Sequence, residues 1–444
     1  MVKISQIFTS IIGRPIADKH ALDELQQALF EDIENSEDNF FVQGQAGTGK
    51  STFVQYLKAH TKKRFRIACP TAIAALNIGG VTLHSLFRFP FSDFFIFEKL
   101  QLAQKTKQIL QKTDILIIDE VSMVRPDMLD AIDMLAQQAR GNSAPFGGLQ
   151  ILLIGDLCQL PPVITSGVKH VFEKEYGHKE AYFFDARAYR EGNFKTVELT
   201  RVYRQSDTEL LQHLQNIRKD VDIDESVTYF NTAKIRDMAT IKTAVTITPY
   251  RKVADDINSG KLDAIQAEPR SYACKISGNF DASKETPAPA ILTLKVGAQV
   301  IFNRNISPEC INGTSAIVTS LEDDVIGVRL LGNNLSVVVG RAKWPKYAYE
   351  YNRDTGAVEE KEVGAFEHFP LQLGYALTIH KAQGKTLDKV IIDMDRGTFA
   401  HGQLYVALSR TRTKADMHIL KRVDESDVIL DKRVVKFLGN TPTR

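Results

Sequence analysis

The sequence is poor in the residues that crosslink small or secreted proteins. Its 444 residues include four widely spaced cysteines and no C-x-x-C pair: Cys69, Cys158, Cys274 and Cys310. This spacing argues against a disulfide framework or a closed zinc site and favours a reducing compartment. Uninterrupted apolar runs do not exceed about five residues, far short of the ~20 that cross a bilayer. We therefore expect an intracellular, cytoplasmic protein without membrane segments or organellar targeting.

The sequence also lacks an excess of either charge. It has 56 lysines and arginines against 54 acidic residues, which leaves a formal net charge of +2. A nucleic-acid partner would therefore have to be bound by local basic patches rather than by the overall field. The composition, 43% hydrophobic and 25% charged, excludes a disordered or fibrous chain, and the length allows two to four compact units.

Short apolar runs alternate with helical stretches in the first half of the chain, after a helical segment over residues 1–35. This alternation predicts an α/β fold with a parallel sheet covered on both faces. The expected strands are residues 40–44, 65–69, 115–119, 150–155 and 195–199.

A second α/β block is expected further along the chain. Its expected strands are residues 244–250, 389–395 and 416–422. Between 297 and 370, period-two strands divided by turn residues predict a meander, which we interpret as a small β-barrel inserted into the second unit. Residues 268–290 are expected to form a loop or linker.

A phosphate-binding motif follows the first expected strand. Residues 44–51, GQAGTGKS, fit G-x-x-x-x-G-K-[ST] between a strand and a helix. Such a loop binds phosphate through backbone N–H groups and the helix N-terminus. Lys50 is placed to reach the terminal phosphates, and the Ser51 hydroxyl to ligate Mg²⁺. The expected nucleotide-binding residues here are Gly44, Ala46, Gly47, Thr48, Gly49, Lys50, Ser51 and Thr52.

Two acidic residues end the strand at 115–119. Asp119 is placed to hold Mg²⁺, directly or through water, and Glu120 to orient or deprotonate an attacking water. Beside an intact phosphate loop, this pair predicts a nucleoside-triphosphatase. The sequence contains no N-K-x-D-like guanine motif, which argues against a GTPase.

Three more polar residues are candidates for contact with the γ-phosphate. Gln159, in GDLCQLPPV, follows another apolar strand, Arg204 follows the strand at 195–199, and Arg410 lies in YVALSRT. An arginine beside the γ-phosphate stabilises charge in the transition state. A surface or structural ion pair is the alternative interpretation for each arginine.

Seven blocks of the sequence occur in an informative order. They are GQAGTGKS, ACPTAIAALNIGGVTLHSLF, DEVSM, PFGGLQILLIGDLCQLPPV, LTRVYRQ, LGYALTIHKAQGKTLD and YVALSRT. Together they resemble the Pif family, which belongs to the RecD-like, 5′-to-3′ branch of superfamily-one DNA helicases. The resemblance implies two RecA-like domains that close on ATP, with a small β-barrel inserted in the second.

The resemblance also implies a division into domains. The expected parts are an N-terminal helical segment, 1–37; domain 1A, 38–205, with a short insertion 1B near 86–112; domain 2A, 206–304 and 371–444; and the inserted barrel 2B, 305–370.

Roles for individual residues follow from the same resemblance. Arg204 and Arg410 correspond to the two arginine fingers, and Gly384 to a further nucleotide contact. Gln26 or Gln27 corresponds to the glutamine that reads adenine, and we favour Gln26. The residues expected to face single-stranded DNA are Thr71, Thr82 and His84 from the first domain, and Thr378, His380 and Lys381 from the second. A core or capping histidine is the alternative for His84.

Three segments are rich in aromatic or basic residues, and the first two have two interpretations each. Residues 87–97, with six phenylalanines, form either a hydrophobic mini-core or a base-stacking surface. Residues 341–353 form either a packed barrel face or a DNA contact. The basic run at 60–66 is expected to be a solvated surface.

We therefore expect an ATP- and Mg²⁺-dependent helicase that moves 5′ to 3′ on single-stranded DNA and unwinds duplex or structured DNA. The resemblance implies DNA junctions or G-quadruplexes as partners, and roles in DNA repair, recombination and telomere maintenance. We expect a monomer in solution, with dimerisation on DNA left open. The alternatives are a helicase subunit of a recombination or conjugation complex, an ATP-gated DNA clamp without unwinding, and an RNA-directed enzyme.

Overall fold

The computed structural model describes residues 22–440 except 91, 96, 236–240, 242, 282–285 and 353. The first 21 residues of the predicted N-terminal helical segment lie outside the described residues. The rest of that segment is confirmed by helix α1, Glu24–Asn35. Its start is fixed by a capping box, because the Asp23 side chain accepts from the Gln26 N–H and the Gln26 side chain accepts from the Asp23 N–H.

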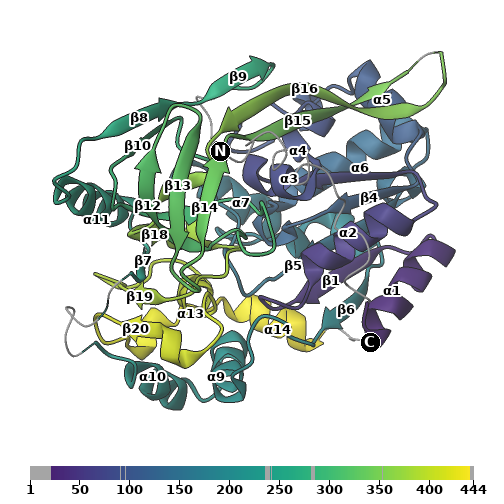
Figure 1. Ribbon diagram of the computed structural model, residues 1–444. Coiled ribbons are helices and arrows are strands. Elements are labelled where there is room, and N and C mark those ends of the chain that lie inside the picture. Colours follow the sequence, from purple (N-terminus) through teal and green to yellow (C-terminus); the bar gives the residue numbers. More distant parts are fainter. Residues whose placement is uncertain are drawn as a thin grey trace.

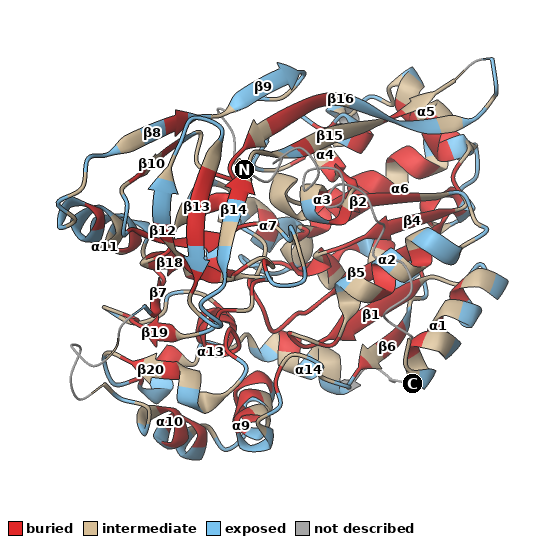
Figure 2. Ribbon diagram, viewed as in Figure 1, coloured by how far each residue is buried: buried red, intermediate tan, exposed pale blue. Residues whose placement is uncertain are grey.

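The first unit is built on a six-stranded parallel sheet in the order β3-β2-β4-β5-β1-β6, of which Figure 1 labels β4, β5, β1 and β6. The strands are β1 Phe40–Gly44, β2 Phe65–Cys69, β3 Val81–Thr82, β4 Ile115–Ile118, β5 Gln150–Gly155 and β6 Lys195–Leu199. Strands β1, β4 and β5 are buried along their whole length, as Figure 2 shows in red. The five predicted strands are confirmed, and the prediction missed β3, which at two residues is too short for a periodic signal.

Helices cover both faces of this sheet because successive strand residues are apolar on both sides. Phe40 and Val42 pack in one hydrophobic cluster, and Phe41 packs in another on the opposite face. The helices of this unit are α2 Lys50–His60, α3 Ala72–Ile78, α4 Leu83–Phe87, α5 Gln104–Gln111, α6 Pro126–Arg140, α7 Lys169–Tyr176 and α8 Arg187–Glu191.

The second unit contains a four-stranded parallel sheet in the order β18-β7-β19-β20. Its strands are β7 Val245–Thr248, β18 Ala376–Thr378, β19 Val390–Ile392 and β20 Met417–Ile419. Its helices are α9 Thr208–Lys219, α10 Ile223–Asn231, α11 Arg251–Asp263, α12 Ile379–Ala382, α13 Gln403–Leu408 and α14 Lys432–Asn440. The prediction of two parallel-sheet units is confirmed. One hydrophobic cluster contains buried residues of both sheets, among them Leu116, Ile118, Val245 and Ile392.

The inserted segment forms an antiparallel sheet in the order β14-β13-β12-β11-β17. Its strands are β11 Gln299–Phe302, β12 Ser315–Leu321, β13 Val325–Leu330, β14 Ser336–Gly340 and β17 Leu371–Leu373. The meander is confirmed, but closure into a barrel is not. In the part of the chain that the structure describes, β14 pairs with β13 alone, and the next strand joins a different sheet.

That different sheet is formed by a long hairpin, β15 Ala342–Tyr351 and β16 Val358–His368, with β9 Lys275–Gly278. Strands β8 Arg270–Ala273 and β10 Ile291–Leu294 form a further pair. The prediction of a linker over 268–290 is therefore wrong for β8 and β9. Strand β9 is exposed at every residue and is held by backbone pairing with β16, so it carries no hydrophobic pattern.

The β15–β16 hairpin packs on the first unit (Figure 1). The Tyr349 hydroxyl accepts from the Ile67 N–H at 3.0 Å, and Lys105 pairs with Glu350 at 2.8 Å. Tyr349 and Trp344 are buried, so these two side chains pack inside the protein, although the hairpin that carries them belongs to a separate sheet and not to the predicted barrel face. This contact also buries Arg66, whose guanidinium lies 4.9 Å from the Tyr349 ring centroid.

The basic run at 60–66 is therefore not simply a solvated surface. Besides the buried Arg66, Lys63 donates to the carbonyl oxygen of Ile33 at 2.7 Å and to Gln150 Oε1 at 2.6 Å, which ties α1 to the sheet. The expectation of a solvated run is wrong for these two residues, because each has carbonyl or ring partners on neighbouring elements.

The phenylalanine-rich segment is confirmed as a mini-core for its buried members. Phe87 and Phe89 stack with ring centroids 5.4 Å apart, and Phe89 and Phe95 lie 4.6 Å apart. All three are at most 6% exposed. Phe91 lies outside the described residues.

No helix within the described part of residues 22–440 is long and apolar enough to span a bilayer. All four cysteines are free thiols.

Candidate nucleotide and nucleic-acid site

The phosphate loop between β1 and α2 requires its glycines. Gly47 and Gly49 have φ values of 87° and 81°, in the left-handed region that side chains disfavour. A Cβ on Gly44 would lie 2.5 Å from Thr48 Oγ1, and a Cβ on Gly47 would lie 2.5 Å from the Cβ of Arg204. The loop therefore packs closely against the segment that follows β6.

Lys50 is the first residue of α2. Its Nζ donates to the carbonyl oxygens of Gly44 at 2.6 Å and Gln45 at 3.1 Å. Burial lowers the pKa of Lys50, although the nearby carboxylates of Asp156 and Glu120 favour its charged form. The N-cap of α2 is Gly49, whose lack of a side chain leaves the first-turn N–H groups open to an anion. Phosphate oxygens could accept hydrogen bonds both from Lys50 Nζ and from the N–H groups of the first turn of α2.

Asp119 and Glu120 lie at the carboxyl end of β4, as predicted. The Glu120 backbone is left-handed, at φ 54°, and its N–H donates to Asp119 Oδ1 at 2.9 Å. Such a backbone costs about 1–3 kcal/mol and is found at functional sites. Burial, with repulsion from Asp119, raises the pKa of Glu120 to about 7. Burial also raises the pKa of Asp119. Glu120 is therefore suited to accept a proton near neutral pH.

Gln159 lies beside Glu120, and a residue of the second unit joins them. Gln383 Nε2 lies 3.4 Å from Glu120 Oε2 and 3.2 Å from Gln159 Oε1. Gln159 in turn donates to Asp156 Oδ2 at 2.8 Å. Gln383 was not among the residues predicted from the sequence. The signal available was its position in TIHKAQG, the block that supplied the expected DNA contacts.

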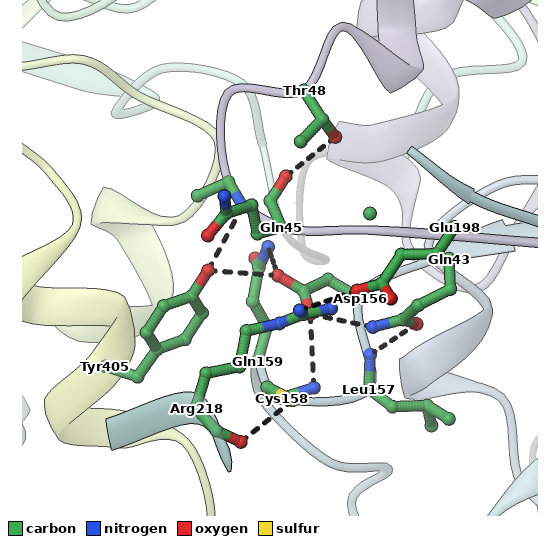
Figure 3. A network of polar contacts seen from close by, with 12 residues as sticks. Gln43, Gln45, Thr48, Asp156, Leu157, Cys158, Gln159, Glu198, Arg218 and Tyr405 are labelled. Carbon is green, nitrogen blue, oxygen red and sulfur yellow. Dashed lines mark hydrogen bonds and ion pairs between the residues drawn. The ribbon is translucent and has the colours of Figure 1, made fainter. Parts of the chain in front are cut away.

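Asp156 is the centre of a buried polar network (Figure 3). Besides Gln159, its carboxylate accepts from Gln43 Nε2 at 3.3 Å and from the Tyr405 hydroxyl at 3.4 Å, and it lies 3.6 Å from Arg218 Nε. The Tyr405 hydroxyl also accepts from the Ala46 N–H of the phosphate loop at 3.2 Å. Since Tyr405 is on α13 and Arg218 on α9, this network connects the phosphate loop to the second unit. Neither residue was predicted.

The two predicted arginine fingers lie near one another. Among the described residues, the buried Nη1 of Arg204 has no hydrogen-bond partner. Arg410 is 1% exposed, and it donates to the carbonyl oxygen of Val406 at 2.6 Å and to Ser409 Oγ at 2.6 Å. Burial and the positive charge of Arg204 lower the pKa of Arg410 to about 9. An anion bound between the two guanidinium groups would give Arg204 Nη1 a hydrogen-bond partner and would offset the repulsion between the two positive charges. These two residues therefore fit a polyphosphate.

Gln26 and Tyr203 border the loop on the side of α1. Gln26 Nε2 lies 3.4 Å from the carbonyl oxygen of Thr48, whereas Gln27 donates to Glu31 on its own helix. A Cβ on Gly49 would lie 3.5 Å from the Tyr203 ring. Tyr203 is 51% exposed, so its ring is available to a base. The sequence prediction for LTRVYRQ named Arg204 alone, although an aromatic residue directly before it was visible.

Gly384 follows Gln383 with φ 77°. It begins the turn that leads away from α12. The nucleotide contact expected at Gly384 stays a prediction.

The three threonines predicted to face DNA share one structural role. Each is the N-cap of a short helix that follows a strand: Thr71 accepts from the Ala74 N–H, Thr82 from the Ser85 N–H and Thr378 from the Lys381 N–H. The first two belong to the first unit and the third to the second, so both sheets present the same strand–threonine–helix arrangement.

The other predicted DNA residues lie on these short helices. His380 and Lys381 are exposed on α12. His84 is half-buried on α4, with ring centroids 6.1 Å from Phe89 and 6.2 Å from Phe95. It therefore borders the phenylalanine mini-core, and part of its surface stays accessible.

Comparison with known proteins places these features in one family. The family model "PIF1-like helicase" matches residues 21–225, "DNA helicase Pif1, 2B domain" matches 283–321, and "UvrD-like helicase C-terminal domain" matches 373–416. An ATP-dependent DNA helicase Pif1 from Bdellovibrio bacteriovorus is 30% identical, over 93% of this chain and 90% of its own length. The chain belongs to the PIF1-like helicases. The family resemblance noted in the sequence is thus confirmed.

Other relatives of this PIF1-like chain are longer. It is 31% identical to the ATP-dependent DNA helicase PIF1 of Rattus norvegicus, over 95% of this chain but 64% of the rat protein. It spans 61% of the corresponding protein of Emericella nidulans, at 28% identity.

Solved structures of Bacteroides sp Pif1 match this chain over nearly its whole length. The complex with ADP-AlF4 has a TM-score of 0.88 at 36% identity, over 95% of this PIF1-like chain and 97% of that one. The unliganded structure has a TM-score of 0.86, and the structure bound to single-stranded DNA has a TM-score of 0.68. Over nearly its whole length, this chain is therefore more similar to the first two structures than to the one bound to single-stranded DNA.

The Asp156 network predicts a large effect on stability. In Asp156→Ala, the buried Arg218 loses one of its two carboxylate partners and the Tyr405 hydroxyl loses its acceptor. We expect the free energy of unfolding to fall by about 3–5 kcal/mol, measured by urea denaturation. Asp354→Ala, in the exposed turn of the hairpin, is the matched control. Equal denaturation midpoints for the two variants would contradict a stabilising network.

Proposed function

We propose that this chain is an ATP- and Mg²⁺-dependent DNA helicase that translocates 5′ to 3′ on single-stranded DNA and unwinds duplex DNA. The observation that supports the proposal is that groups of both parallel-sheet units meet around the phosphate loop and Glu120. The first unit supplies the phosphate loop, Glu120 and Gln159, and the second supplies Gln383 and Tyr405. Nucleotide bound there would alter the separation of the two units, which is the movement that a translocase needs.

The chemistry assigned to the site follows from the positions of its groups. The phosphate-loop N–H groups and Lys50 would bind the phosphates, and the Ser51 hydroxyl and Asp119 carboxylate would hold Mg²⁺ with phosphate oxygens and waters. When bound, Mg²⁺ would neutralise charge on the β- and γ-phosphates. The Glu120 carboxylate would take a proton from the attacking water as its oxygen bonds to the γ-phosphorus, and ADP would leave.

The remaining polar groups would act on the charge that develops in this step. Arg204 and Arg410 would move onto the γ-phosphate from either side, and Gln159 would contact it once the units close. Gln26 would bind the adenine edge and Tyr203 would stack on its face, which would favour ATP over other nucleotides.

For nucleic acid, the support comes from the strand–threonine–helix arrangement and from the relatives. Bacteroides Pif1 has been solved bound to single-stranded DNA, and another similar structure describes the unwinding of forked double-stranded DNA by two coordinating Pif1 helicases. We assign the DNA path in this chain to six residues on both units: Thr71, Thr82, His84, Thr378, His380 and Lys381. Forks and other junctions, G-quadruplexes among them, are the proposed substrates, bound by a monomer that can pair on DNA.

The domain division proposed for this motor follows the expectation from the sequence. It assigns 38–205 to domain 1A, 206–304 with 371–444 to domain 2A, and 305–370 to domain 2B, with the segment near 86–112 as 1B. The match of a Pif1 2B-domain model to residues 283–321 supports a 2B domain, but it begins within the segment assigned above to 2A. Strand β11 of the inserted sheet also lies before residue 305, so we propose that 2B begins earlier than the sequence expectation placed it.

The test is strand displacement from a duplex that carries either a 5′ or a 3′ single-stranded tail, with Lys50→Ala as the inactive control. We expect ATP-dependent displacement from the 5′ tail alone. Displacement from the 3′ tail alone would refute the polarity. ATP turnover that DNA stimulates, without displacement from either tail, would favour the second candidate, an ATP-gated DNA clamp.

Arg204→Ala tests the assigned arginine finger. The unpartnered guanidinium would stabilise charge that exists only in the transition state, so nucleotide affinity should stay near that of the wild type. The turnover number should fall by about 10³-fold or more. Arg190→Ala, at an exposed position on α8, is the control. Wild-type turnover in Arg204→Ala, measured by phosphate release, would show that the finger is assigned wrongly.

The pH dependence of ATP hydrolysis tests the role of Glu120. Its pKa is raised to about 7, and only the carboxylate can accept the proton. The value of kcat/KM for ATP, which reports the free enzyme, should therefore rise with pH up to about 7 and level off above it. A profile that is already flat above about pH 5, as expected for a glutamate of ordinary pKa near 4.3, would contradict this assignment.

A further inference from the structure

Helix α12 joins the expected DNA contacts to the hydrolysis site. Thr378 is its N-cap and Gln383 its C-cap, with His380 and Lys381 exposed between them. The Thr378 hydroxyl accepts from the Lys381 N–H at 3.3 Å, and the Gln383 N–H donates to the carbonyl oxygen of Ile379 at 3.1 Å. The two ends of this single turn are thus linked by hydrogen bonds and would move together.

The second unit packs around α12 and supports it as a rigid piece. Ile379 and Ala382 are both fully buried. Arg410 donates to the carbonyl oxygen of Ala382 at 3.3 Å and to that of Lys385 at 3.3 Å. The arginine finger of the second unit is therefore bonded to the same turn as Gln383, so a displacement of α12 would be transmitted to both.

The side chain of Gln383 contacts two residues of the first unit that the proposed hydrolysis uses. One amide nitrogen lies between Glu120 Oε2, at 3.4 Å, and Gln159 Oε1, at 3.2 Å. Both distances exceed the usual N–H···O length of about 2.9–3.0 Å, and hydrogen bonds weaken steeply as they lengthen. A shift of α12 by a few tenths of an ångström toward the first unit would bring both bonds to normal length.

We propose that Gln383 is the positioning residue through which single-stranded DNA bound at α12 sets the geometry of Glu120 and Gln159. This inference rests on the proposed function and deepens it, since it names the route by which DNA stimulates ATP hydrolysis. DNA phosphates held by Thr378, His380 and Lys381 draw α12 toward the first unit. The amide of Gln383 then fixes the Glu120 carboxylate for the attacking water and the Gln159 side chain for the γ-phosphate.

The experiment measures ATP turnover with and without oligothymidylate, together with oligothymidylate affinity by fluorescence anisotropy. In Gln383→Ala, we expect the DNA-stimulated turnover number to fall so that the stimulation ratio drops by about tenfold or more, because misplacement of a catalytic group by about 1 Å can cost about 10²-fold. The affinity for oligothymidylate should equal that of the wild type. Gln212→Ala is the matched control, since Gln212 donates to Asn216 on its own helix α9, and it should keep the wild-type ratio.

Gln383→Met separates positioning from packing. It keeps a side chain of similar length but removes the N–H donor that lies 3.4 Å from Glu120 Oε2, without adding a charge. We expect the same loss of stimulation as in Gln383→Ala, whereas a residue that only fills space would tolerate methionine.

Each other result overturns the inference. A wild-type stimulation ratio in Gln383→Ala would show that DNA acts by another route, and weaker oligothymidylate binding would make Gln383 a DNA contact. A higher ATP turnover of Gln383→Ala in the absence of DNA would show that Gln383 inhibits hydrolysis. A wild-type protein whose turnover does not respond to oligothymidylate would instead refute the proposed function, so the two failures are distinguishable.

Discussion

The buried carboxylate of Asp156 is the group on which the arrangement of the two units depends. A charge taken out of water is costly unless it is paired and hydrogen-bonded, and Asp156 is 1% exposed. Its partners come from β1, from the segment after β5, from α9 and from α13. The first unit supplies neutral hydrogen-bond donors, and the second unit adds the positive charge of Arg218 and the Tyr405 hydroxyl. Because the Tyr405 hydroxyl also binds the Ala46 N–H, the shape of the phosphate loop depends on the position of the second unit.

This constraint explains why the polar and apolar parts of the interface are separated. The hydrophobic cluster that contains residues of both sheets stabilises the association of the two units, but the hydrophobic effect is non-directional and does not fix their orientation. The polar groups gather where the parallel strands of the first unit end, and there each hydrogen bond is directional. The carboxyl ends of β1, β4, β5 and β6 deliver Lys50, Glu120, Gln159 and Arg204 to that edge, which the second unit closes. The polar contacts that would position the hydrolysis site are therefore the same contacts that hold the two units together.

The parts of this structure that could be predicted from the sequence depend on short-range pattern. Strands β1, β4 and β5 are continuous apolar runs, and the phosphate loop is fixed by glycine spacing. Gln383 and Tyr405 could not be found in this way, because they meet Glu120 and Ala46 across separations of 263 and 359 residues. Gln26 and Gln27 are adjacent on one helix, and only the fold shows which one faces Thr48. Strand β9 escaped notice because an exposed strand has no hydrophobic signature.

Nucleotide bound between the two units should set their separation, since its phosphates would contact groups from both. The most direct test is an electron–electron distance measurement between spin labels at Lys62→Cys and Arg251→Cys, exposed positions on the first and second units. The partly exposed Cys274 would be replaced by serine, since the other three cysteines are buried. We expect a non-hydrolysable ATP analogue with Mg²⁺ to shorten and narrow the distance distribution, and Lys50→Ala to abolish this change. An identical distribution with and without the nucleotide would contradict a nucleotide-controlled separation.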